Sequence, residues 1–296
     1  MRYFAFAVMI VAVATARADE KKDKEFLNGF SWGVSVAEIK DLAERGVFED
    51  VKLPTKTGVC VVYTNPYGVA SKGGVVPLTL IDVVNGKRVR TPDDFIKATE
   101  SIKPGDRISM RAHLPMDAGR SLKWSGKTIK GVARPRLEGL KEQAKAEEDV
   151  ASGATHYRHK DTSEFVNSKS EVYIDIVSSG ATVVPRLGIR YVADDWLFIE
   201  DAKLVIGEKA YAVPLNGKRF ERDNKSTIWE WIVLAPESTD ESDPLMKIMQ
   251  EMSRNGPVQL VLNGQQYRKD RKLEDAELGR ITQMWWYFLA LRSGAF

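Results

Sequence analysis

The chain has 296 residues, enough for two domains at roughly 150 residues each, and its 43% apolar and 29% charged composition excludes a disordered, collagen-like or polytopic membrane protein. Lysine and arginine outnumber aspartate and glutamate by only 44 to 41, which argues against nucleic acid as a partner. The single cysteine, Cys60, excludes an intrachain disulfide and a zinc site made of cysteine alone.

Residues 1–18 have the pattern of a signal peptide. Arg2 precedes an apolar run over Tyr3–Thr15, and the triplet Ala16-Arg17-Ala18 has the small-x-small form that a signal peptidase reads. The run is shorter than the roughly 20 residues needed to span a bilayer. We therefore expect an exported protein, periplasmic or extracellular, that begins at Asp19 and has no membrane span after cleavage. A retained anchor is the alternative.

Residues 26–135 are expected to form the first domain. Alternating apolar and small residues predict a strand over Phe30–Val36, followed by a short helix over Ala37–Arg45. Thr91 and Pro92 predict the start of a second helix that ends before Pro104. Further strands are predicted over Gly58–Tyr63, Leu78–Val84, Ile108–His113 and Lys123–Val132.

Several motifs in this domain occur together. They are Gly58-Val-Cys-Val-Val-Tyr63, the pair Gly73-Gly74, the turn Val84-Asn85-Gly86-Lys87, the pair Asp94-Phe95 and the run Lys103-Pro-Gly-Asp-Arg-Ile108. In combination they resemble a PDZ domain of the bacterial, HtrA-type, circularly permuted kind, without the protease domain. The resemblance covers about Phe30 to Pro135. It departs at Leu78-Thr79, where the family usually has Gly-Asp, so we expect that loop to turn differently.

The resemblance implies a PDZ-like, partly open β-barrel with two helices and a groove that binds a peptide or protein C-terminus. Glycine in the Trp32-Gly33-Val34 loop would let backbone amides approach the terminal carboxylate. The peptide would pair as an added strand, beside a pocket shaped by the following helix. The implied peptide-binding residues are Trp32, Gly33, Val34, Ser35, Val36, Ala98, Thr99 and Ile102. The alternative is a groove that other parts of the chain cover.

Residues 136–170 are expected to form a charged helical linker, because Arg136–Val150 has few apolar positions and Ala151–Ser170 is polar and rich in turn residues. His156 and His159 are spaced as a metal-binding pair could be. However, no further ligand accompanies them, and the basic residues beside them would repel a cation. A solvated loop is favoured, and we expect no metal and no cofactor.

Residues 171–296 are expected to form a β-rich domain that ends in a long amphipathic helix over Leu273–Leu291. A shorter helix is predicted over Leu245–Met252, and Asn263-Gly264 predicts a hairpin turn. The strands are predicted over Val172–Val177, Val183–Val192, Trp196–Ile206, Lys209–Pro214, Ile228–Leu234, Val258–Leu262 and Gln265–Arg268. This half resembles an uncharacterised bacterial domain type, which implies no activity. The fold class is therefore α+β or mainly β.

The sequence favours a non-enzymatic protein-interaction module. It has neither a Gly-x-Ser-x-Gly nucleophile motif nor a glycine-rich phosphate loop, and it has only three histidines, so we expect no catalytic residue. The tryptophans of the second half could stack on a sugar, but the alternation in Trp229-Glu230-Trp231 suits a buried core equally well. A structural two-domain scaffold and a hydrolase with its site in the C-terminal domain remain as alternatives. The oligomeric state stays open.

Overall fold

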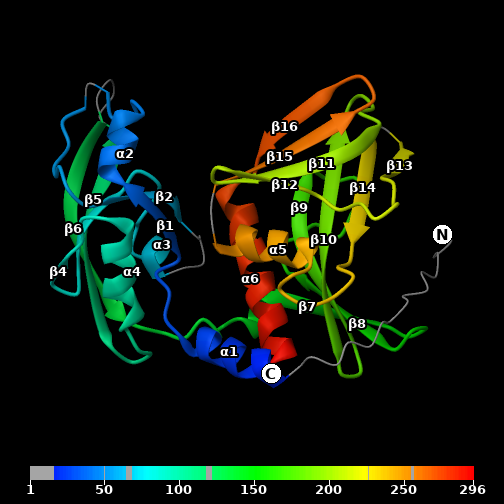
Figure 1. The fold of residues 1–296 in the computed structure, drawn as a ribbon, viewed down its shortest axis with the longest axis horizontal. Coiled ribbons are helices and arrows are strands. Elements are labelled where there is room, and N and C mark those ends of the chain that lie inside the picture. Colours follow the sequence, from blue (N-terminus) through cyan, green and yellow to red (C-terminus); the bar gives the residue numbers. More distant parts are fainter. Residues whose placement is uncertain (1–16, 50, 65–68, 118–121, 226, 255–256) are drawn as a thin grey trace.

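The computed structural model describes residues 17–49, 51–64, 69–117, 122–225, 227–254 and 257–296. The apolar run of the expected signal peptide, Tyr3–Thr15, lies outside the described residues. The first described element is helix α1 (Arg17–Asn28), which spans the predicted cleavage point after Ala18. Figure 1 shows two β-rich units side by side, with α1 beside the lower end of the C-terminal helix.

The first unit contains one antiparallel sheet in the order β1-β2-β3-β5-β6, with β4 paired to β3. Among the described strands, β1 and β6 stand at opposite edges and do not pair with each other. The sheet is therefore open, where the resemblance implied a partly open barrel. Its strands are β1 (Val34–Glu38), β2 (Val59–Thr64), β3 (Leu80–Val84), β4 (Lys87–Arg88), β5 (Arg107–Asp117) and β6 (Leu122–Val132), and its helices are α2 (Ile39–Glu44), α3 (Val69–Lys72) and α4 (Pro92–Glu100).

Helix α4 begins where the sequence predicts. Thr91 has an extended backbone, and its hydroxyl oxygen accepts a hydrogen bond from the amide of Asp94 at 3.2 Å, which satisfies a main-chain donor of the first turn. Pro92 occupies the start of the helix, where no backbone N–H is needed. Phe95 and Ala98 are buried against the sheet. The cap and this apolar spacing together determine where α4 starts and which face it buries.

Two residues with positive φ shift the predicted strand boundaries. Gly33 takes a φ of 73°, so the strand predicted over Phe30–Val36 starts only at Val34. Leu78 takes a φ of 68°, a conformation that favours glycine, and β3 accordingly starts at Leu80. Leu78 is the position at which the sequence departs from the usual Gly-Asp pair of the family it resembles.

The prediction of a helical linker over 136–170 is wrong. After a short 3₁₀ turn, η1 (Lys141–Gln143), the chain forms the hairpin β7 (Ala144–Asp149) and β8 (Ala154–His159). The Asp149 carboxylate accepts bonds from Ala151 N and Ser152 Oγ, and Gly153 takes a φ of 66°, so these residues form a tight turn. Pairing of β8 with the next strand therefore overrides the helical composition of this segment.

The second unit contains two antiparallel sheets, in the orders β13-β14-β10-β9-β8-β7 and β12-β11-β15-β16. β13 was not predicted from the sequence. The strands that follow β8 are β9 (Glu171–Ser179), β10 (Thr182–Ala193), β11 (Ile199–Ile206), β12 (Lys209–Ala212), β13 (Glu221–Asn224), β14 (Ile228–Leu234), β15 (Val258–Gly264) and β16 (Arg268–Lys272).

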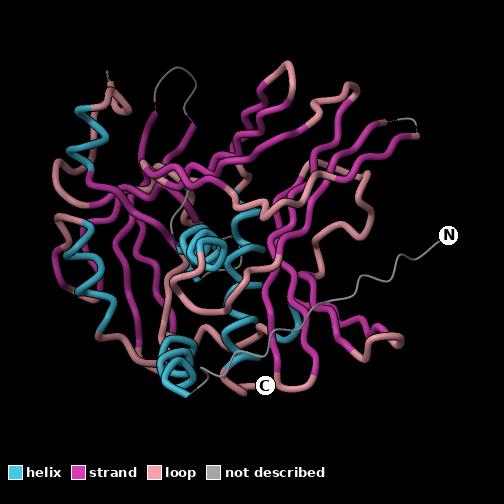
Figure 2. The backbone as a smooth tube through the Cα atoms, turned by 45° about the vertical axis from the view of Figure 1, so that its right-hand side comes forward, coloured by secondary structure: helices cyan, strands magenta, loops and turns pink. Residues whose placement is uncertain are grey.

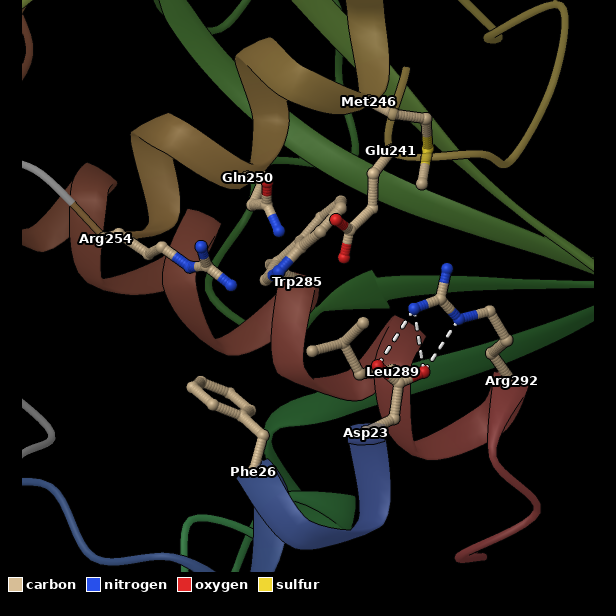
Figure 3. Close-up of a pocket in the computed structure, with 9 residues that line it drawn as sticks. All are labelled: Asp23, Phe26, Glu241, Met246, Gln250, Arg254, Trp285, Leu289 and Arg292. Carbon is tan, nitrogen blue, oxygen red and sulfur yellow. Dashed lines mark hydrogen bonds and ion pairs between the residues drawn. The ribbon is translucent and has the colours of Figure 1, made fainter. Parts of the chain in front are cut away.

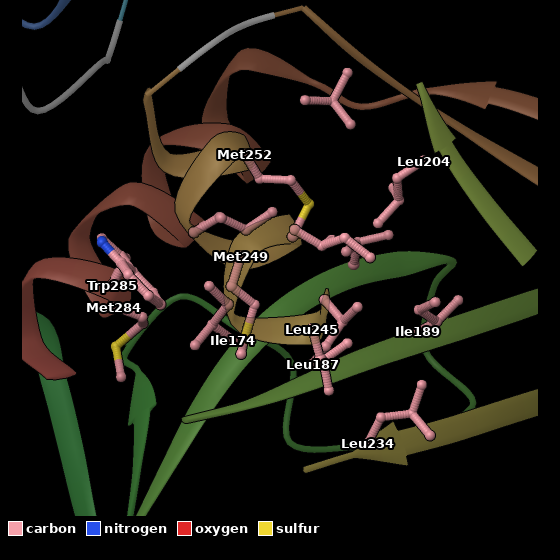
Figure 4. Close-up of a cluster of buried hydrophobic side chains, with 14 of the residues drawn as sticks. Ile174, Leu187, Ile189, Leu204, Leu234, Leu245, Met249, Met252, Met284 and Trp285 are labelled. Carbon is pink, nitrogen blue, oxygen red and sulfur yellow. The ribbon is translucent and has the colours of Figure 1, made fainter. Parts of the chain in front are cut away.

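The main core of the second unit lies between these sheets and two helices, α5 (Pro244–Arg254) and α6 (Asp275–Arg292). Figure 4 shows Leu245, Met249 and Met252 of α5 among buried leucine and isoleucine side chains of the neighbouring strands. The apolar side chains whose spacing predicted α5 and α6 therefore face this core. Trp229, in contrast, is buried outside this cluster, on the opposite face of β14 from Ile232.

Two boundaries in the second unit also differ from the prediction. The strand predicted from Trp196 starts at Ile199, because Phe198 takes a left-handed φ of 53°. The turn predicted at Asn263-Gly264 lies further along the chain, since Asn263 pairs with Asp201 and thereby extends β15. In the second case, pairing between distant strands moved a boundary that local turn chemistry had suggested.

The first unit is inserted into the second. Phe30 and Pro135 form an isolated bridge, and beside it Leu137 N donates to Leu27 O at 3.2 Å. Leu27 belongs to the main core of the second unit, although the expected domain boundary placed residue 26 onwards in the first. Asp23 of α1 forms a bidentate ion pair with Arg292 of α6 at 2.8 and 2.9 Å. Helix α1 therefore packs with the second unit, and the chain enters and leaves the first unit at adjacent points.

The fold is mainly β, with helices packed on open sheets, which confirms the coarse fold prediction. Strands account for most of the regular backbone in Figure 2. Within the described ranges, every helix is too short or too polar to cross a membrane.

Candidate functional site

Strand β1 is an edge strand of the first sheet, and its free side carries main-chain groups. Opposite Val36, Val61 donates its N–H to the Thr79 carbonyl and accepts a hydrogen bond from Leu78 N, both in the segment just before β3. Val36 therefore points its main-chain groups away from β2, and the alternation along a strand gives Val34 the same direction. The side of β1 away from β2 can thus accept another strand.

Helix α4 contacts β1 and supplies apolar side chains beside it. Ala98 is 4% exposed and Ile102, just beyond the helix, is 6% exposed, and Val34 and Val36 pack against the same apolar cluster. Four of the predicted site residues are therefore brought together. They belong to one apolar cluster that lies between the edge strand and the helix.

Thr99 and Ser35 are placed differently. Thr99 is half-buried, and its hydroxyl donates to the Ile96 carbonyl at 2.8 Å, so the hydroxyl is already used within the helix. Ser35 lies opposite Tyr63 of β2, and the alternation of side chains puts it on the other face of the strand from Val34 and Val36. The side chain of Ser35 is therefore separated from the apolar cluster.

Trp32 and Gly33 form the loop that leads into β1. The Trp32 side chain is only 2% exposed and meets the Phe30 ring edge-on, with ring centroids 5.2 Å apart. Its carbonyl accepts a hydrogen bond from Ala70 N at 3.0 Å. Trp32 therefore anchors the loop in the core, and its side chain and carbonyl are both used within the first unit.

The sequence analysis missed Ser31. Its hydroxyl oxygen accepts a hydrogen bond from the Gly33 amide at 3.1 Å, so the amide expected to hold a carboxylate already has a partner. The hydroxyl that accepts this bond still has its own proton to donate. A serine two residues before a turn glycine is a recognisable local motif, and this signal could have been read from the sequence.

The three histidines lie at three separate places. His113 Nε2 is 3.6 Å from an Asp82 carboxylate oxygen. Burial raises the pKa of Asp82, but the hydrogen bonds and charge of Arg111 outweigh it and hold that pKa below its ordinary value. His113, Asp82 and Arg111 therefore form an ion cluster on β3 and β5, whereas the predicted site residues lie on and beside β1 and α4.

His156 and His159 lie on strand β8, which corrects the prediction of a solvated loop. Residues three apart on a strand face opposite sides. His156 accordingly faces Arg186, while His159 is buried and its Nε2 lies 2.7 Å from the Gln283 side-chain oxygen of α6. In the part of the chain that the structure describes, no group of three or more histidine, cysteine or acidic side chains could hold a metal ion.

Comparison with known proteins found no matching family model and no matching curated protein.

Proposed function

We propose that the first unit is a PDZ-like module that binds the C-terminus of a peptide or protein along β1, in a protein that acts by binding rather than by catalysis. The observation that carries this proposal is the edge position of β1 beside α4, with the main-chain groups of Val34 and Val36 directed to the open side. An extended peptide that adds to such an edge gains main-chain hydrogen bonds, which give affinity without requiring a particular sequence.

The terminal carboxylate would lie at the Ser31–Gly33 loop. Gly33 has a φ of 73° and no side chain to block a close approach. Ser31 Oγ, which accepts from the Gly33 amide, can donate its own proton to a carboxylate. The last side chain of the peptide would rest on Val34, Ala98 and Ile102, so an apolar terminal residue is preferred.

Fluorescence anisotropy with labelled peptides that end in valine, leucine or phenylalanine tests the proposal. We expect micromolar dissociation constants, which correspond to a binding free energy of about 8 kcal/mol in favour of the complex. Amidation of the peptide terminus should weaken binding by about tenfold or more, because a charge-assisted hydrogen bond is lost. An internal segment that binds as tightly as a free C-terminus would contradict the carboxylate assignment.

Gly33→Val should abolish binding, since the added carbons occupy the space of the carboxylate and strain a positive φ. Gly86→Val is the matched control: Gly86 also has a positive φ, 76°, but a Cβ there meets nothing within 4 Å and lies in the β3–β4 turn. If folded wild-type protein binds none of these peptides, the groove is part of a structural scaffold and the proposal fails.

A further inference from the structure

The β7–β8 hairpin forms one edge of the six-stranded sheet, in the lower part of the second unit in Figure 1. β7 is the last strand in the order of that sheet, and among the described strands it pairs with β8 alone. From Lys145 to Asp149 every residue of β7 is exposed. Such an edge strand carries main-chain donors and acceptors that can pair with another strand.

Side chains of β8 hold the hairpin against helix α6. The centroids of the Tyr157 and Tyr287 rings lie 5.4 Å apart. His159 Nε2 lies 2.7 Å from the side-chain oxygen of Gln283. Because both contacts join β8 to α6, the edge is held in position in the free protein, which lowers the entropic cost of binding a partner.

The main-chain groups of β7 alternate between β8 and the open side of the sheet. Gln143 O accepts a hydrogen bond from Lys160 N at 2.7 Å, so the Gln143 carbonyl points towards β8. Ala144 has an extended backbone, with a φ of −107° and a ψ of 142°. The alternation along an antiparallel strand therefore directs the N–H and C=O groups of Ala144, Ala146 and Glu148 to the open side.

The charges along β7 indicate which strand this edge fits. Charged side chains on an edge usually prevent association, and like charges directly opposite each other are destabilising. Two copies of β7 can pair antiparallel about a two-fold axis centred on Ala146. Lys145 of each copy then lies opposite Glu147 of the other, and Ala144 lies opposite Glu148. In this register every charged residue of the paired segment faces an opposite charge or an alanine.

The neighbouring registers are unfavourable. A two-fold axis between antiparallel strands is perpendicular to the sheet and keeps each side chain on its own face, so the pairing is centred on a residue. Centred on Glu147, it would put two Glu147 carboxylates opposite each other, and centred on Lys145 it would do the same with two ammonium groups. Only the register centred on Ala146 combines opposite charges with hydrogen-bonded pairs of the outward-facing residues.

The edge strand β16 of the other sheet shows the contrast. Its full-length antiparallel pairing with a second copy would be centred on Asp270. That pairing would put Arg268 opposite Lys272 and Lys269 opposite Arg271, so like charges would face each other along the strand. The charge pattern of β7 is therefore not a general property of the exposed edges of this unit.

We propose that the protein forms a symmetric dimer in which two copies of β7 pair about Ala146, so that the two six-stranded sheets become continuous. Lys145 also pairs with Glu164 of its own chain at 2.9 Å, and both side chains are more than half exposed. A lysine ammonium group has several donors, so it can keep this contact and also bond Glu147 of the second copy. Because the shared surface is small, we expect a dissociation constant of about 1 to 100 µM.

Sedimentation velocity of the purified protein at about 1 to 300 µM tests this proposal. We expect the wild type to pass from monomer to dimer over this range. Lys145→Glu and Glu147→Lys each put like charges opposite each other at both symmetric positions, so each should weaken association by about tenfold or more. Lys209→Glu makes the same charge change on the exposed edge strand β12 and should leave association unchanged. Glu164→Gln, which removes only the internal partner of Lys145, should not weaken it.

A mixture of the two single variants separates specific pairing from damage to the fold. When one Lys145→Glu chain pairs with one Glu147→Lys chain, opposite charges face each other again at both positions. The mixture should therefore associate at least about tenfold more tightly than either variant alone, and the double variant Lys145→Glu/Glu147→Lys should dimerise like the wild type.

Three results would overturn the proposal. The first is a wild-type protein that stays monomeric up to about 300 µM. The second is a Lys145→Glu variant that associates as the wild type does, or loses no more than Lys209→Glu. The third is a mixture of Lys145→Glu and Glu147→Lys that associates no better than the separate variants, with circular dichroism showing that both are folded.

Discussion

Replacement of Glu230 by glutamine should strongly destabilise the second unit. Glu230 is fully buried in β14, and its Oε1 accepts hydrogen bonds from the amides of Leu197 and Phe198 at 2.8 Å each. Its Oε2 accepts from Ile199 N at 2.8 Å and from Arg222 Nε at 2.9 Å. One carboxylate therefore holds three successive amides, including that of Phe198 in its left-handed conformation.

Glutamine has the same size but has an NH₂ group in place of one oxygen, so two of the four donors would face another donor. A buried donor left without a partner costs about 1–3 kcal/mol. Loss of the ion pair with Arg222 adds to this cost. The addition is smaller than the cost of breaking a fully buried pair, because the Arg222 side chain is 34% exposed. We therefore expect a loss of about 3 kcal/mol, or about 6 to 12 °C in Tm for a unit of this size.

Thermal and urea denaturation followed by circular dichroism measures this effect. Glu221→Gln is the matched control, because Glu221 lies on the neighbouring strand β13 and is exposed. The control should stay within about 0.5 kcal/mol of the wild type. A loss of under about 1 kcal/mol in Glu230→Gln would refute the argument that this carboxylate holds the 197–199 segment.

Three further predictions concern stability. Thr91→Ala should cost about 1 kcal/mol in urea denaturation of the first unit, because the amide of Asp94 loses its acceptor; an unchanged midpoint would contradict the cap. Gly188→Ala should cost about 3 kcal/mol or more, since the new Cβ would lie 2.1 Å from the Tyr173 ring; thermal melting decides this. Burial, the largest cause, lowers the pKa of His159 below its usual 6.5, so the unfolded chain takes up protons more readily and stability should fall as the pH drops below about 6.5; His159→Gln should reduce this fall between pH 7.5 and 5.5, and an identical fall in the variant would contradict the assignment.

Local patterns in the sequence predicted most of the regular elements. Thr91, Pro92 and the apolar spacing after them predicted α4, and the strands predicted over Ile108–His113 and Lys123–Val132 lie within β5 and β6. These helices and strands depend on interactions between residues close together in the sequence, so the local sequence is enough to predict them. The same patterns placed Val34 and Val36 on one strand and Ala98 on the helix beside it.

Tertiary structure decided the features that depend on residues far apart in the sequence. The charged segment Ala144–Asp149 has a helical composition but forms a strand, because β8 pairs with both β7 and β9. The edge position of β1 and the burial of Trp32 likewise depend on the order of the whole sheet.

The same reason explains why no motif in the sequence marked the pocket between three helices that Figure 3 shows. Most of its lining comes from α1, α5 and α6, which are far apart in the sequence and meet only in the folded protein. The sequence directly specifies side-chain chemistry and local conformational preference. The distance between two side chains far apart in the sequence is set by the packing of the helices and strands that carry them.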